Sequence, residues 1–241
     1  MSVRDLHPLK GEPDFHWRGG SPTRVEALSD MVFAFALTLL VVSSDPPSSF
    51  AELNAQLWGF PGFAAAFAIL LLIWHSHYIF FRRYALEDAW TTAVNAALLF
   101  LILFFVYPLK YLATMLSRFV ETVAQGAPRP PFTFEEAEYS LALLSIGYAA
   151  VFLLFFALYA HALSKSDALE LSERERQQTR FALWQQGVHV AVGATTAVAA
   201  LTLPAPWSTL AGFIYSLIGP LIFVGGLIFV PGPRRAPSPG L

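Results

Sequence analysis

The sequence predicts an all-α integral membrane protein with six transmembrane helices in one repeat. Of the 241 residues, 56% are hydrophobic and only 13% are charged, whereas soluble domains carry about 25% charged residues. The apolar residues form six segments long enough to cross a bilayer, for which a helix needs about 20 residues. Connecting segments that are rich in Lys and Arg also alternate along the chain with segments that contain few of them, as in multi-pass membrane proteins.

Prolines and polar clusters separate the six predicted spans. The spans are residues 24–44, 53–81, 90–116, 140–163, 179–203 and 207–230. The separators include SSDPPSSF, GAPRPPFTFEEAE and SKSDALELSERERQQTR, whose prolines and charges interrupt apolar helices. Residues 1–20 are interpreted as a flexible cytoplasmic tail and residues 232–241 as a disordered, proline-rich cytoplasmic tail. The six-helix transmembrane domain therefore covers residues 21–231.

The basic residues predict the orientation in the membrane. All 15 Lys and Arg residues except Lys110, Arg118 and Arg129 fall in segments that a six-span arrangement puts inside, so both termini are expected in the cytoplasm. The net charge of −2 gives no indication of nucleic-acid binding, and the absence of cysteine excludes disulfides and thiolate metal sites. A soluble bundle of unusually apolar helices is the alternative, and the span lengths and charge pattern oppose it.

The first span has a charged end. Thr23 and Glu26 have the spacing of a capping box, which puts Arg24 in the first helical turn at the membrane surface. Asp30 lies about 9 Å further along the axis, and a buried charge of this kind costs up to about 3 kcal/mol in a span. Asp30 therefore requires partners or water. A structural network between helices and an ion pathway both remain open interpretations.

One face of the first span carries a lone hydroxyl between apolar residues. Phe35, Thr38 and Val42 step by three and four residues and so share a face, with Leu39 beside it. This pattern is compatible with ordinary packing, in which Thr38 bonds to a carbonyl of its own helix. If the face lined a symmetric pore, rings of Phe35 and Val42 would form hydrophobic constrictions, with Thr38 as the polar ring between them.

Polar residues of the next two spans are candidate partners for Ser29 and Asp30. Trp74 and His77 share one face of the second span, and Asn95 lies inside the third. Buried polar groups need hydrogen bonds, so we expect these side chains to meet if the three helices pack together. The sequence contains no hydrolase, zinc-protease, Walker or dinucleotide motif and no T-V-G-Y-G filter. We therefore expect no enzyme activity, cofactor or bound metal.

The first span also carries a family signature. Arg24-x-x-x-Leu28-Ser29-Asp30, followed by FAFALTLLVV, resembles the R-x-x-x-F-S-D signature of the lysosomal potassium channels of the transmembrane protein 175 family. The likeness is strongest over residues 24–109. It implies a potassium-selective leak channel of the bacterial plasma membrane, built as a homotetramer because this chain has a single repeat. The first helices of the repeats line the pore in this family.

The resemblance also implies roles for individual residues. They are a hydrophobic gate at Phe35, deeper apolar layers at Leu39 and Val42, a selectivity contact for permeant potassium at Thr38, and a network that holds the helix at Arg24, Ser29, Asp30, Trp74 and His77. Leu28 replaces the phenylalanine of the signature.

Phe35 stands where family members usually have a smaller Ile or Leu, so a tighter constriction is expected. Two other functions remain open: a secondary transporter or proton pathway using Asp30 and membrane histidines, and a non-transporting scaffold. The sequence has no inverted repeat and no centrally broken span of the kind that transporters use.

Overall fold

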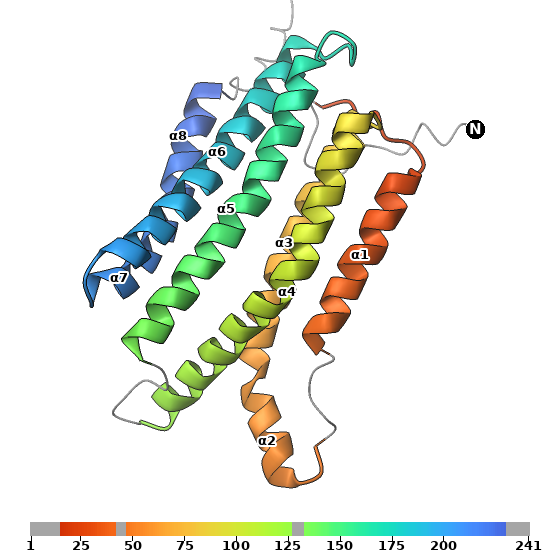
Figure 1. Ribbon diagram of the computed structural model, residues 1–241. Coiled ribbons are helices and arrows are strands. Elements are labelled where there is room, and N and C mark those ends of the chain that lie inside the picture. Colours follow the sequence, from red (N-terminus) through yellow and green to blue (C-terminus); the bar gives the residue numbers. More distant parts are fainter. Residues whose placement is uncertain (1–14, 42–46, 127–132, 230–241) are drawn as a thin grey trace, which may run out of the picture.

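The computed structural model describes residues 15–41, 47–126 and 133–229, and these residues form helices and short connections (Figure 1). The helices are α1 Arg24–Val41, α2 Phe50–Trp58, α3 Phe60–Tyr84, α4 Ala89–Ala124, α5 Phe134–Ser164 and α6 Glu173–Thr202, followed by α7 Trp207–Leu210, the 3-10 helix η2 Ala211–Leu217 and α8 Ile218–Phe229. The prediction of an all-α protein is confirmed.

The long helices form an elongated bundle in which neighbours in sequence are neighbours in space. α1 packs against α3 and α4 at one edge, α4 packs against α5, and α5 packs against α6. At the opposite edge α8 and η2 cover α6. The short helices α2 and α7 lie at the end of the bundle away from the N-terminus in Figure 1. α1 is therefore an edge helix, and part of its surface remains open.

Four helical segments in the described ranges are long and apolar enough to cross a membrane. They are Phe60–Tyr84, Ala89–Ala124, Phe134–Ser164 and Trp207–Phe229. The other two predicted spans correspond to α1 and α6. α1 carries Arg24, Glu26 and Asp30 within its 18 residues, and α6 begins with a charged turn and contains Gln185 and Gln186. The chain is a multi-pass membrane protein, and its six-span count stays a prediction.

Several helix boundaries differ from the predicted spans. The span predicted at 53–81 is two helices, α2 and α3, separated by Gly59, with Pro61 in the first turn of α3. Proline is tolerated there because the first turn of a helix needs no backbone donor. α4 and α5 both extend beyond their apolar spans. Asp88 and Thr133 cap their first turns from within polar segments, so the helices start where the caps are.

Residues 15–20 form an ordered segment, the N-terminal strap, and the prediction of a flexible tail is wrong for them. Phe15 is buried and packs edge-on against Tyr84, with 5.6 Å between ring centroids. The backbone N–H of Gly19 donates to the carbonyl of Arg82 at 3.0 Å. Aromatic residues in this segment gain stability by leaving water, which the polar composition of the tail concealed. Residues 1–14 and 230–241 lie outside the described part.

Ion pairs join the strap to the helix ends beside it. Arg18 Nη1 lies 2.9 Å from Glu175 Oε1, and its Nε donates to the carbonyl of Leu169. Burial opposes ionisation of Glu175, but hydrogen bonds from Arg18, Ser172 and the backbone of His16 outweigh it and lower its pKa to about 2. The strap therefore attaches to the start of α6 through a charged carboxylate outside the predicted span.

Candidate functional site

The two sides of α1 differ in burial. Phe33, Ala36 and Leu40 are buried against the neighbouring helices. On the other side an exposed stripe consists of Leu28, Met31, Phe35 and Thr38, of which the first three are 54%, 63% and 56% exposed. These four positions step by three or four residues, so they form one continuous helical face. The described residues of the protomer leave this exposed stripe uncovered.

A buried polar network lies behind the stripe and joins three helices. Ser29 Oγ on α1 accepts a hydrogen bond from Asn95 Nδ2 on α4 at 3.0 Å and donates to the carbonyl of Val25. The other side of the amide, Asn95 Oδ1, lies 2.8 Å from His77 Nε2 on α3. Ser29, His77 and Asn95 are each at most 2% exposed. Buried hydrogen bonds of this kind fix the rotation of α1 about its axis.

The structure also brings Asp30 and Trp74 together. The indole Nε1 of Trp74 donates to Asp30 Oδ1 at 2.8 Å, while the carboxylate remains exposed. The side chain of Arg24 in the first turn is exposed and makes no hydrogen bond or ion pair with any other described residue. The basic partner at this end of α1 is a different residue. Arg82 on α3 forms a buried ion pair with Glu26, with 2.5 Å between Nη2 and Oε1.

The Glu26–Arg82 pair was not predicted as part of the site. Sequence spacing assigned Glu26 to the capping box, and Glu26 Oε2 does accept from the backbone N–H of Thr23 at 2.8 Å. Its second oxygen, Oε1, is the one that binds Arg82. Arg82 Nη1 also donates to the carbonyl of Gly20 in the strap. The sequence did contain a signal for this pair, because Glu26 lies in the first turn of the first span and Arg82 lies at the end of the second.

Thr38 has a specific hydroxyl orientation. Its Oγ1 donates to the carbonyl of Ala34 at 2.8 Å, so its proton is directed back to the helix. A hydroxyl keeps two acceptor lone pairs, and on this exposed face they are available to a cation. Leu39 lies half-buried at the edge of the stripe. Val42, the third predicted constriction residue, lies outside the described residues.

The histidines of the bundle lie in separate environments. His77 contacts Asn95, His161 Nε2 lies 2.7 Å from Asp88 Oδ2, and His189 Nδ1 lies 2.5 Å from the hydroxyl of Tyr148. Burial opposes ionisation of Asp88, but hydrogen bonds from His161 and from Thr91 outweigh it and lower its pKa to about 2. In the part of the chain that the structure covers, no cluster of three His, Asp or Glu side chains is arranged to hold a metal ion.

Comparison with known proteins gives consistent similarities. Residues 24–105 match the family described as endosomal/lysosomal potassium channel TMEM175. A protein of Marivirga tractuosa named as a potassium channel is 36% identical over 233 residues, covering 92% of this chain and 94% of that protein. A potassium channel of Streptomyces collinus is 28% identical over 193 residues, covering 76% of this chain and 86% of that protein.

A solved structure extends the similarity to the fold. The crystal structure of a variant of the potassium channel MtTMEM175, in complex with a nanobody–MBP fusion protein, matches with a TM-score of 0.79 and 33% sequence identity. The match covers 90% of this chain and 97% of that chain. The family match includes α1, α2, α3 and the first half of α4. These elements carry the exposed stripe and the polar network behind it.

Proposed function

Because the chain belongs to the TMEM175 potassium channel family, we propose that it is a potassium-selective leak channel of the bacterial plasma membrane. Four copies assemble around an axis, and α1 of each copy lines the pore. Both termini lie in the cytoplasm. A relative that is named as a potassium channel and covers 92% of this chain supports this function, and the family is one of channels, not of enzymes.

The exposed stripe of α1 is the observation that supports a pore most directly. The opposite side of α1 is fixed to α3 and α4 by the Ser29–Asn95–His77 network and by the Glu26–Arg82 pair. A helix that is fixed to its own protomer on one side and is exposed on the other is suited to line a symmetry axis shared with other copies of the chain. In a four-fold assembly each residue of the stripe becomes a ring.

The rings have distinct physical effects on a permeating ion. A ring of four Phe35 side chains forms a hydrophobic constriction that closes by excluding water. One turn further, four Thr38 hydroxyls present acceptor oxygens that replace part of the ion's hydration shell. Four Asp30 carboxylates at the cytoplasmic mouth attract cations. Leu39 and Val42 continue the apolar wall beyond Thr38.

Coupled transport through Asp30 and the histidines is not favoured by the geometry. A proton pathway requires titratable groups that follow one another in space. His77, His161 and His189 instead each bond to a different partner. Asp30 accepts a hydrogen bond from Trp74, and no hydrogen bond among the described residues joins its carboxylate to the buried Ser29–Asn95–His77 network. Leak flux and coupled flux differ in their kinetics, so a measurement of ion flux separates the two functions.

Replacing Phe35 with alanine is the test of this function. Purified protein in liposomes should pass potassium faster than sodium, and Phe35→Ala should raise potassium flux several-fold because the constriction widens. Phe100→Ala is the matched control, since Phe100 is a 72% exposed phenylalanine on α4. Potassium flux at the background level in both wild type and Phe35→Ala would contradict a channel. Saturable flux that depends on a second ion would indicate transport instead.

A further inference from the structure

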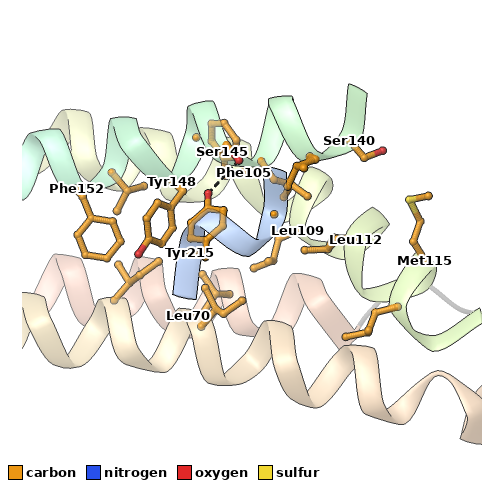
Figure 2. A pocket seen from close by; sticks show the side chains of 18 of the residues that line it. Leu70, Phe105, Leu109, Leu112, Met115, Ser140, Ser145, Tyr148, Phe152 and Tyr215 are labelled. Carbon is orange, nitrogen blue, oxygen red and sulfur yellow. Dashed lines mark hydrogen bonds between the residues drawn. The ribbon is translucent and has the colours of Figure 1, made fainter. Parts of the chain in front are cut away.

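An apolar cavity of about 630 Å³ lies between α3, α4 and α5 (Figure 2). Its wall follows α5 from Ala137 to Phe152, about 22 Å at 1.5 Å per residue. Tyr215 of η2 lies along it and donates its hydroxyl proton to Ser145 Oγ at 3.0 Å. This pair of hydroxyls is satisfied within the protein, so the cavity offers its occupant mainly apolar contact.

Gly147 shapes one part of the cavity wall. A side chain at this position would overlap the ring of Phe105, so the glycine lets that ring lie directly against the backbone of α5. Leu112 and Met115 line the cavity further along α4 (Figure 2). The cavity lies among segments that are apolar enough to span a membrane.

A second hollow of about 480 Å³ adjoins the cavity, because Ser140 and Leu144 line both. Its lining is different in chemistry: three tyrosines and two carboxylates, namely Tyr107, Tyr111, Tyr139, Glu135 and Glu136. The carboxylate of Glu136 accepts hydrogen bonds from Thr133. The side chain of Glu135 is exposed and makes no hydrogen bond or ion pair with another described residue. This acidic, aromatic groove attracts cations.

We propose that the cavity and the groove together bind one bilayer phospholipid with a primary ammonium headgroup. One acyl chain occupies the cavity, because bilayer hydrocarbon surrounds these helices and a cavity of this length and apolarity fits a chain. The ammonium group lies against Glu135 and the tyrosine rings, where carboxylate contact and cation–π attraction favour it. An anionic headgroup is disfavoured at the same place by the two carboxylates.

Native mass spectrometry of the detergent-purified protein tests this site. Phosphatidylethanolamine and phosphatidylglycerol with identical acyl chains are titrated separately, and bound lipids per subunit are counted. Phosphatidylethanolamine should bind more tightly to wild type. Glu135→Gln should reduce that preference about threefold, the size expected for one exposed charge contact. Glu135 is exposed, so this change leaves the packing intact.

A cavity-filling variant supplies the second arm. Leu112→Trp should abolish binding of both lipids, while Leu153→Trp, at a 53% exposed position on α5 outside the cavity, should bind as wild type. Equal binding of the two lipids by wild type would overturn the headgroup assignment. Unchanged binding in Leu112→Trp would overturn the site. If Leu112→Trp loses subunits from the assembly while its lipid binding is unchanged, a neighbouring copy of the chain fills the cavity, and the lipid assignment is overturned. These readouts do not depend on ion flux.

Discussion

Asn95 is the residue on which the packing of α1 depends most. Its amide bonds to Ser29 on one side and to His77 on the other, and all three side chains are buried. Removing the amide leaves His77 Nε2 without its Asn95 partner and Ser29 Oγ with only its bond to the carbonyl of Val25, and a buried polar group that loses its partner costs about 1–3 kcal/mol.

We predict that Asn95→Ala lowers stability by about 3 kcal/mol, seen as a lower apparent melting temperature in detergent. The loss comes from the broken hydrogen bonds to His77 and Ser29 together with the cavity left by the side chain. Asn54→Ala is the control, because Asn54 lies exposed on α2. Equal melting temperatures for the two variants would show that the network contributes little to the fold.

The sequence predicted some contacts of the site and not others. Helical spacing put Trp74 and His77 on one face, and a buried Asn95 required a partner, so their meeting with Ser29 and Asp30 followed once the three helices were adjacent. The Glu26–Arg82 pair was missed because Glu26 already had a local explanation as a capping residue. One carboxylate performs both tasks, with one oxygen for each.

At the scale of elements, the hydrophobic segments predicted where the helices lie more accurately than where each helix begins and ends. Spans were predicted from apolar residues, but helices start at caps such as Asp88 and Thr133, which lie in polar segments. The break at Gly59 was missed because the apolar pattern continues through it. The strap was missed for the opposite reason, since Phe15 and Trp17 are isolated in a polar stretch and only tertiary contact buries Phe15.

The strap yields a prediction that depends on pH. The folded-state pKa of Glu175 is about 2, below its ordinary value of 4.5, so its stabilising contribution is complete above about pH 4.5 and is lost as the pH falls towards 2. Arg18→Gln should therefore destabilise the protein by about 2 kcal/mol at pH 7, and the difference from wild type should shrink towards pH 3.

Melting temperatures of both proteins between pH 3 and 7 measure this difference. Arg180→Gln serves as the control, since Arg180 is exposed and its nearest carboxylate oxygen, on Glu173, is 3.9 Å away. Asp88 also titrates at low pH, but it is present in every protein compared. A difference between wild type and Arg18→Gln that stays constant with pH would mean that Arg18 does not act through the charge of Glu175.

At the scale of the whole molecule, α1 lies at one edge of the bundle, and α6, η2 and α8 lie at the other. α5 and α6 pack closely, and α6 is covered by η2 and α8. α1 stands at the far edge with its exposed stripe uncovered. The sequence alone predicted which residues share this face but not that the face is free, because exposure depends on where the other helices lie. The proposed tetramer is the assembly that covers it.

The proposed position of Thr38 on the potassium path is the central claim, and the chain is well suited to test it because it contains no cysteine. Four thiolates introduced by Thr38→Cys around a narrow pore would bind cadmium, a soft cation that thiolates prefer. Cadmium should block potassium flux through Thr38→Cys and leave wild type and Leu153→Cys unaffected. Potassium flux through Thr38→Cys that is as insensitive to cadmium as that of Leu153→Cys would contradict a pore lined by α1.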